Sequence, residues 1–365
     1  MEISVIKPKI PLQTLELSGS MNEIGYKLGV KCKSSIDRFL EWFYEEFQGK
    51  ITKEQALRHA KKHIPFIEEY CPITAEEMRG IAEGSGRTYE EITLISLHEE
   101  IQSFTERRCT AFAATGEATL GNDTYIGQNW DADLISYRDG EFPLLLNVKP
   151  DTGPNYLAYA YPGMPAGAGL NSYGIGLSWN SVPRLELTIG VPTYTIIAEI
   201  LHQKTIGDAL GIIIKVKRAG CFNFIIGDED GEIYDVEATP SDLDIYYSDR
   251  YIGHANHYIS EALRRKQKWA DLSFGGKNPD TLIRHNRMNK FLKQKCGKID
   301  LKVCMDFLKD HVNYPNSICR HPDSQLEPKK QTITYDSWVM ITNKKEWWIA
   351  HGPPCGNEFK KYIVR

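Results

Sequence analysis

The sequence predicts a layered α+β fold in which antiparallel sheets are covered by helices. Three observations support this prediction. Apolar residues recur with helical periodicity before Arg107, strand and turn patterns dominate after it, and further helical segments separate the resulting hairpins. Hairpins form antiparallel sheets, and such sheets are stable when helices cover their apolar faces. No repeat of fixed period and no low-complexity segment interrupts this order.

The first expected helices lie in residues 20–50 and 53–70. Apolar side chains recur there at the three- and four-residue spacings of one helix face. In the first segment these residues are Ile24, Leu28, Ile36, Phe39, Leu40 and Phe43. The periodicity therefore predicts helices in both segments.

Two capping boxes predict two further helix starts, at Thr74-x-x-Glu77 and at Thr88-x-x-Glu91. In such a box the hydroxyl and the carboxylate each accept a backbone N–H of the first turn. The second helix should run through Ile101 and end near Phe104.

Strand patterns begin at Cys109 and form four expected hairpins, each with Gly, Asn or Asp between its strands. These hairpins pair residues 109–115 with 125–130, 142–149 with 156–161, 222–226 with 232–238, and 338–342 with 346–351. The intervening segments expected to be helical are residues 194–203, 206–215, 257–269, 279–295 and 300–311.

The composition is that of an ordinary globular protein, with 41% hydrophobic and 25% charged residues in a chain of 365. A formal net charge of −4 gives no basic surface for nucleic acid or anionic lipid. Neither a secretory signal nor a membrane-spanning stretch is apparent, so we expect a cytoplasmic protein that does not bind membranes. Eight scattered cysteines without a CxxC pair indicate neither a disulfide framework nor a zinc site.

The hairpin that begins at Cys109 brings a thiol and a carboxylate together. If its turn centres between Leu120 and Gly121, Cys109 lies opposite Asp131, and directly opposed residues share a face of the sheet. Asn129 would lie nearby. A bulge would change this register.

These residue types also have simpler interpretations. A cysteine on a strand is commonly a small buried hydrophobic residue, and an aspartate near a turn is commonly a local hydrogen-bond acceptor. The position of Cys109, at the boundary between the helical and the hairpin-rich segments, favours a nucleophile instead.

Several ordered motifs resemble one family of enzymes. They are Gly19-Ser20-x-x-Glu23-Ile24-Gly25-x-x-Leu28-Gly29, Arg107-Arg108-Cys109-Thr110-Ala111-Phe112, Gly127-Gln128-Asn129-Trp130-Asp131, Gly169-Leu170-Asn171-x-x-Gly174, the strand pair within residues 228–240, His254-Ala255-Asn256-His257, Pro315-Asn316-Ser317-Ile318-Cys319-Arg320 and Gly352-Pro353-Pro354-Cys355. Together they resemble the acyl-coenzyme A:6-aminopenicillanic acid acyltransferase family, which also includes hydrolases of β-alanyl amines. The motifs cover most of the chain.

The resemblance implies a four-layer αββα fold and a precursor that cleaves itself between Arg108 and Cys109. Residues 1–108 would form a helical α chain and residues 109–365 a catalytic β chain, together making one domain whose two chains stay associated. Arg108 departs from the small or acidic residue more usual at this position, which puts the efficiency of cleavage in question.

The resemblance also implies roles for particular residues. Cys109 would be the catalytic nucleophile, and Asp131 would hold the new N-terminus and position the thiol. Asn256 would donate its amide to the oxyanion, and Arg320 would be the active-site guanidinium. The neighbouring residues expected to bind substrate are Thr110, Asn129 and Trp130.

Cleavage before Cys109 would create a nucleophile that carries its own base. The thiol attacks the preceding carbonyl, an N-to-S acyl shift gives a thioester, and water cleaves it. The liberated α-amine has a reference pKa of about 7.7 to 8.0, suited to a general base near neutral pH. A substrate amide would then acylate the sulfur, and water or an amine would take the acyl group.

Two of these residues have alternative interpretations, and other residues were considered as rival sites. Asn256 could cap the helix expected from His257, and Arg320 could form a surface ion pair, although a planar guanidinium also suits a carboxylate-bearing substrate. His254 and His257 resemble half a metal site, but no third ligand has recognisable spacing, so no metal is expected. Cys221, Cys319 and Cys355 are rival thiols that cannot become chain termini.

The sequence therefore predicts a self-processing cysteine amidohydrolase or acyltransferase that acts on a small N-acyl or aminoacyl amide without a cofactor. One alternative keeps this fold and makes amine acylation by an acyl-CoA substrate the main activity. The other is an uncleaved, non-catalytic binding protein, an interpretation that Arg108 supports.

Overall fold

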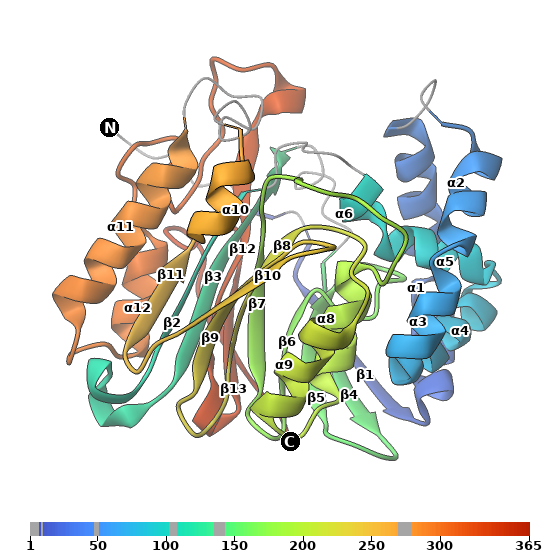
Figure 1. Ribbon diagram of the computed structural model, residues 1–365, viewed down its shortest axis with the longest axis horizontal. Helices are drawn as coiled ribbons and strands as arrows, with labels where there is room; N and C mark the ends of the chain where they lie inside the picture. Colours follow the sequence, from blue (N-terminus) through green and yellow to red (C-terminus); the bar gives the residue numbers. More distant parts are fainter. Residues whose placement is uncertain (1–6, 9, 47–50, 102–107, 135–142, 269–278) are drawn as a thin grey trace.

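Two β-sheets lie face to face in the computed structural model (Figure 1), which describes residues 7–8, 10–46, 51–101, 108–134, 143–268 and 279–365. Within these residues the larger sheet has eight strands in the order β1-β4-β5-β6-β7-β8-β9-β10. The smaller sheet has six, in the order β11-β2-β3-β12-β13-β14. The β1–β4 pair is parallel, and the other strand pairs are antiparallel.

The bounds of these elements are as follows. The larger sheet contains β1 (Gln13–Gly19), β4 (Leu144–Pro150), β5 (Tyr156–Ala160), β6 (Ala168–Asn171), β7 (Gly176–Ser181), β8 (Phe222–Gly227), β9 (Ile233–Ala238) and β10 (Leu243–Tyr247). The smaller contains β2 (Arg108–Ala114), β3 (Tyr125–Asp133), β11 (Tyr251–His254), β12 (Thr332–Ile341), β13 (Glu346–His351) and β14 (Lys360–Ile363). The helices are α1 (Met21–Glu46), α2 (Lys53–Lys61), α3 (Ile64–Tyr70), α4 (Pro72–Ser85), α5 (Tyr89–Ser96), α6 (His98–Ile101), α8 (Thr193–Leu201), α9 (Ile206–Lys215), α10 (Glu261–Lys266), α11 (Asp280–Lys295) and α12 (Leu301–Leu308).

Helices cover the outer faces of both sheets, as Figure 1 shows. Helices α1, α4, α8 and α9 share an apolar cluster with the larger sheet. On the other side, Met288 and Leu292 of α11 and Phe307 of α12 pack against Phe112 and Val339 of the smaller sheet. The resulting order of layers is αββα, which confirms the expected fold class. Because both faces are covered, every side chain of β5 is buried.

Aromatic rings fill the space between the two sheets. The Trp130 ring lies edge-on to the rings of Tyr159, Trp179 and Trp338, with centroid separations of 5.0, 5.8 and 6.2 Å. Such pairs each contribute about 0.5–1.5 kcal/mol beyond the burial of their area. The side chain of Gln128 joins the sheets by hydrogen bonds to the backbone of Trp179 at 2.8 and 3.1 Å.

Glycines allow helices α1 and α4 to approach each other closely. A Cβ atom on Gly25 would lie 2.0 Å from the Glu77 carbonyl oxygen, and one on Gly80 would lie 2.0 Å from that of Asn22. Real Cβ atoms do not come this near, so these two backbones touch only because both residues lack a side chain. This contact accounts physically for the glycine pattern near the start of the chain.

One of the two expected capping boxes is confirmed. Thr88 and Glu91 exchange the predicted hydrogen bonds at the start of α5. That helix ends at Ser96 and is followed by the short α6. The expected helix end near Phe104 lies outside the described residues.

The capping box at Thr74 was wrong. Helix α4 starts at Pro72, with Cys71 as its N-cap, because proline tolerates the first turn, where its missing N–H is not needed. Thr74 lies inside the helix, and its N–H and hydroxyl both donate to Glu199 of α8, at 3.0 and 2.7 Å. A tertiary contact thus replaces the local one.

The remaining elements agree with expectation apart from some bounds, except that the segment expected to be helical over residues 53–70 forms two helices, α2 and α3. The four hairpins form, and α9 has the predicted bounds. The helix expected over residues 257–269 is shorter and begins at Glu261. None of the helices in the described part of the chain has the length and apolar character needed to cross a lipid bilayer.

Candidate active site

Cys109 is the second residue of β2, and its side chain is fully buried in the cluster between the sheets. Its backbone N–H donates to Oδ1 of Asn256 at 2.9 Å, and its carbonyl accepts from Nη1 of Arg284. Side chains from two other segments therefore hold both polar backbone groups of Cys109. The Arg108–Cys109 peptide bond lies at the start of the strand, inside the β2–β3 ladder.

The predicted pairing of Cys109 with Asp131 was wrong by one residue. Cys109 lies opposite Trp130, and Asp131 lies opposite Arg108. The connection between β2 and β3 is not one tight turn, since it contains two short 3-10 turns at Gly116–Ala118 and Leu120–Asn122. A shift of one residue moves a side chain to the other face of a sheet.

Asp131 consequently points to the helix-covered face, where it is fully buried. It accepts a hydrogen bond from the Thr334 hydroxyl at 2.7 Å and one from Nε of Arg320 at 3.2 Å. Burial raises the pKa of Asp131 to about 6, against the opposing charges of Arg320 and Arg284. Asp131 therefore lies on the opposite face of the sheet from Cys109 and is bound to Arg320, another predicted site residue.

Arg320 is fully buried, so the alternative of a surface ion pair was wrong. Besides Asp131, its guanidinium donates to Oδ2 of Asp280 at 2.9 Å and to the Asn316 side chain. Thr334 fixes the backbone of Arg320, with its hydroxyl accepting the Arg320 N–H and its own N–H donating to the Arg320 carbonyl. These contacts join the loop that carries Arg320 to β3, α11 and β12.

Arg284 is a central residue that the sequence did not indicate. It lies on α11, is fully buried, and donates to the Thr110 hydroxyl at 2.9 Å and to Oδ1 of Asn256 at 2.8 Å. Asp280, one helical turn earlier, accepts from it at 3.1 Å and also binds Arg320. Two arginines and two aspartates thus form a charge-balanced cluster beneath Cys109.

Asn256 follows β11 in a tightly held loop. Its amide Nδ2 donates to the Ser181 carbonyl at 2.8 Å, and its backbone N–H donates to Thr281. Glu237 of β9 fixes the rest of the loop by accepting the N–H groups of Ile259 and Ser260. Ser260 is the N-cap of α10, so the alternative role of Asn256 as a helix cap was wrong.

The three residues expected to bind substrate are all buried. Thr110 accepts from Arg284, and the amide of Asn129 donates to the carbonyls of Leu308 and Ile318, at 2.8 and 2.9 Å. Trp130 belongs to the aromatic core described above. Contact of these residues with a substrate stays a prediction.

The histidines considered as half of a metal site have other partners. Nε2 of His254 lies 2.8 Å from Glu237, and Nδ1 of His257 lies 2.9 Å from the Thr281 hydroxyl. Both rings therefore contribute to the loop around Asn256.

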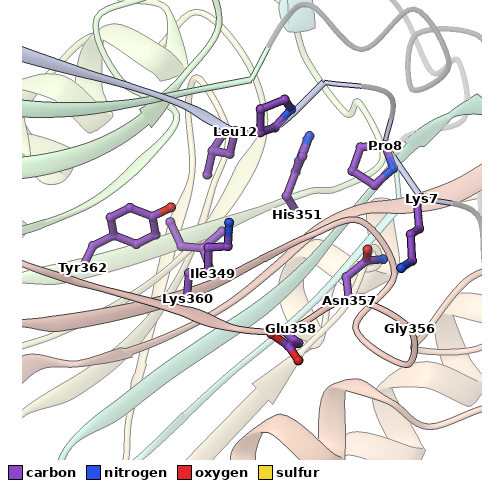
Figure 2. A pocket seen from close by; sticks show the side chains of 11 residues that line it. Lys7, Pro8, Leu12, Ile349, His351, Gly356, Asn357, Glu358, Lys360 and Tyr362 are labelled. Atoms are coloured by element: carbon purple, nitrogen blue, oxygen red, sulfur yellow. The ribbon is translucent and has the colours of Figure 1, made fainter.

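A surface pocket of about 420 Å³ lies elsewhere on the molecule (Figure 2). The residues that line it come from the N-terminal segment, from β13 and β14, and from the link between these strands; they include Leu12, His351, Asn357 and Tyr362. None of the predicted site residues lines it.

The thiol of Cys109 is protonated at neutral pH in the intact chain. Burial raises its pKa to about 12, and the negative charge of Asp131 adds to this effect. A protonated thiol is a poor nucleophile.

The αββα sandwich is the architecture of N-terminal-nucleophile hydrolases, and a thiol, a side-chain amide and two guanidinium groups are buried together in this one. The chain belongs to the acyl-coenzyme A:6-aminopenicillanic acid acyl-transferase family, whose sequence profile matches residues 119–354. This confirms the family resemblance. The matched region begins after Cys109, so it does not include the predicted nucleophile.

Solved structures with a similar fold include two single-residue variants of conjugated bile acid hydrolase from Clostridium perfringens. They are 13% and 15% identical to this chain, each with a TM-score of 0.46, and each alignment covers 70% of this chain and 97% of the other. Penicillin V acylase from Agrobacterium tumefaciens is 12% identical, with a TM-score of 0.44 over 67% of this chain and 83% of the other.

Proposed function

We propose that this protein is a self-processing cysteine amidohydrolase or acyltransferase whose nucleophile is Cys109. The observation that carries the proposal is the pair of hydrogen bonds that join Asn256 and Arg284 to the backbone of Cys109. The Asn256 contact holds the N–H of the peptide bond that precedes Cys109, and the Arg284 contact holds the carbonyl of the bond that follows it. Together they would fix the backbone of Cys109 while its thiol attacks the preceding peptide bond.

Self-cleavage would take two steps. The Cys109 sulfur bonds to the Arg108 carbonyl carbon, the C–N bond breaks, and the nitrogen takes the thiol proton to become an amine. Water then hydrolyses the thioester, which leaves a carboxylate on Arg108 and a free thiol and α-amine on Cys109. The hydrogen bond to Asn256 can survive, because an amine donates as a peptide N–H does.

After cleavage the α-amine would act as general base. It takes the thiol proton while sulfur attacks the substrate amide, and it returns the proton to the departing amine. The S-acyl enzyme then passes its acyl group to water or to another amine. Asp131 would act from behind the strand, holding Arg320 and the terminus of β2 in place.

Two side-chain amides are suited to stabilise the oxyanion. The amide of Asn256 is held beside Cys109 with its nitrogen toward the Ser181 carbonyl. Asn180, the preceding residue of β7, has a buried amide without a hydrogen-bond partner among the described residues. It shares a strand face with Ser178, which accepts from Trp338 of the opposite sheet, so Asn180 also faces the space between the sheets. Removing one oxyanion donor typically lowers kcat by about 100- to 1,000-fold.

The deciding experiment is the intact mass of the purified protein under denaturing conditions. We expect two fragments that part between Arg108 and Cys109, and a single full-length species for Cys109→Ala. Cys296→Ser, which removes a partly exposed thiol at the end of α11, should cleave like wild type. Full-length protein in every sample would contradict the proposal and favour the uncleaved binding protein.

The second candidate function is the acylation of an amine by an acyl-CoA, and the family to which the chain belongs favours it. Its description names acyl-coenzyme A as the acyl donor. Cleaved protein should be incubated with small N-acyl amides, and separately with an acyl-CoA in the presence and absence of an amine acceptor. Consumption of acyl-CoA that requires the amine would identify transfer as the main activity, whereas release of acid from the amides alone would identify hydrolysis.

A further inference from the structure

Four potential metal ligands converge at a point outside the proposed active site. They are His311, Cys319, His321 and Cys355, whose ligand atoms all lie within 4.8 Å of one another. Cys319 and His321 are buried, whereas His311 and Cys355 are partly exposed. Three of these residues come from the loop between α12 and β12, and Cys355 follows β13.

The distances from Nε2 of His321 to the other three ligand atoms fit a tetrahedral zinc site. Zinc binds sulfur at about 2.3 Å and imidazole nitrogen at about 2.0–2.1 Å, so tetrahedral ligands lie about 3.3 Å apart for two nitrogens and about 3.5 Å apart for nitrogen and sulfur. Nε2 of His321 lies 3.1 Å from Nε2 of His311. It lies 3.6 Å from the sulfur of Cys319 and 3.5 Å from that of Cys355.

Hydrogen bonding alone does not explain this arrangement. A neutral imidazole nitrogen carries either one proton or one lone pair, so it can form one good hydrogen bond. Nε2 of His321 nevertheless has three neighbours of ligand type. A cation at the centre would use the lone pairs of all four residues at once.

We propose that His311, Cys319, His321 and Cys355 bind one Zn²⁺ ion in a structural site. Two cysteines and two histidines complete the coordination shell that zinc prefers, leaving no open position for a reacting group. This proposal replaces the sequence-based expectation that the chain has no metal site. None of the four ligands is itself a residue of the proposed cleavage at Cys109.

The metal would hold the loop that carries Arg320. Residues 309–327 contain neither helix nor strand, and a loop of this length needs other constraints to keep one conformation. Two of the ligands flank Arg320 directly, and Cys355 ties them to the end of β13. Zinc would therefore fix the position from which Arg320 reaches Asp131.

Metal content provides the first test. Protein produced without a histidine tag, equilibrated with ZnCl₂ and then dialysed, should contain about one zinc per chain by elemental mass spectrometry. Cys355→Ser and His311→Ala should contain almost none, and Cys296→Ser should retain the wild-type content. Equal zinc in Cys355→Ser and wild type, or no zinc in wild type, would overturn the proposal.

Cobalt substitution tests the ligands in wild-type protein, without relying on variants that fold poorly. Zinc-free protein titrated with Co²⁺ should develop thiolate-to-cobalt charge-transfer absorption and the intense visible bands of a tetrahedral ion, saturating at one equivalent. A spectrum without charge transfer would overturn thiolate ligation. So would a Cys319–Cys355 disulfide found by peptide mapping of protein prepared without oxidant.

Discussion

At the scale of single residues, the site depends on side chains that serve several partners at once. Arg284 contacts the Cys109 carbonyl, the Thr110 hydroxyl, Asn256 and Asp280. The planar guanidinium offers five donors in a fixed arrangement, which a lysine cannot reproduce. Its position therefore sets the orientation of the Asn256 amide as well as that of the strand.

Two substitutions of Arg284 should distinguish the effect of its charge from the effect of its planar shape. Arg284→Lys keeps the positive charge but loses the planar group of five donors. We expect slower self-cleavage in this variant, with a smaller loss of stability than in Arg284→Ala. Arg284→Ala leaves Asp280 with one buried partner fewer and should lower the free energy of unfolding by about 3–5 kcal/mol. Cleavage is followed by gel densitometry over time, and stability by urea denaturation.

The matched control is Arg287→Lys, on the same helix, where a partly exposed arginine pairs with Asp310 at 2.7 Å. It should leave cleavage unchanged. Wild-type cleavage in Arg284→Lys would show that Arg284 acts only as a charge partner for Asp280.

Site residues differed in how far the sequence revealed them. Cys109, Asp131, Asn256 and Arg320 occur in motifs, and the structure brings all four into one buried region. Arg284 lies in a polar helix with no motif of its own, and it reaches Cys109 across 175 residues. A contact of that sequence separation leaves no local pattern in a single chain.

At the scale of elements, the close contact between α1 and α4 depends on glycine. Among the described glycines, a Cβ atom would meet backbone at the shortest distance on Gly25 and Gly80, at 2.0 Å. Gly25→Ala would place a methyl group against the Glu77 carbonyl, forcing the helices apart and lowering the free energy of unfolding by about 1–3 kcal/mol. Gly211→Ala on α9 has space, with its nearest atom 3.8 Å away, and should raise the free energy by about 0.5–1 kcal/mol. Thermal and urea unfolding should show these opposite signs, and equal shifts would contradict the packing argument.

Glu77 of α4 should make stability fall as pH rises through the neutral range. Burial, with a smaller contribution from the charge of Glu199, raises the pKa of Glu77 to about 8 from its ordinary value near 4.5. A folded-state pKa above the unfolded value favours folding at low pH, and this contribution is lost progressively as pH rises from about 4.5 to about 8. Glu77→Gln, which cannot ionise, should therefore lose less stability than wild type between about pH 5 and about pH 8 in urea titrations.

The exposed neighbour Glu76, which pairs with Arg79, supplies the control. Glu76→Gln should follow the wild-type pH dependence. A pH profile of Glu77→Gln identical to that of wild type would show that Glu77 is ionised in the folded protein throughout this range.

Elements with a local signal were predicted well. The pattern of α9 gave its bounds, and the Thr88 capping box gave the start of α5. The predictions failed where a contact with a distant residue determines the local structure. Thr74 is one such case, because its partner Glu199 lies on another helix. The register of β2 and β3 failed because the turn residues between them form two 3-10 turns that residue type alone does not specify.

At the scale of the whole molecule, the segments on the two sides of Cys109 share one core. Strand β1, from the proposed α chain, pairs with β4 over seven residues, and α1 and α4 complete the helical cover of the larger sheet. The layered fold followed from the order of helices and hairpins. The joining of β1 to the larger sheet did not, because a parallel partner so distant in sequence leaves no hairpin signal.

Cleaved protein should therefore behave as one particle. We expect both fragments to elute together in native size-exclusion chromatography, at the volume of uncleaved Cys109→Ala, and to separate only in denaturant. Separation in native buffer would contradict the shared core.

Strand β1 pairs with β4, and the proposed cleavage would put these two strands on different chains. Folding would then change from a reaction of one molecule to a reaction of two. The uncut chain folds as a single molecule, so the rate of its folding should not depend on concentration. Once cut and fully denatured, the same protein can regain its larger sheet only when two separate polypeptides meet. Refolding of the cleaved enzyme should thus slow on dilution while that of Cys109→Ala does not, and the native state is easier to reach before the cut than after it.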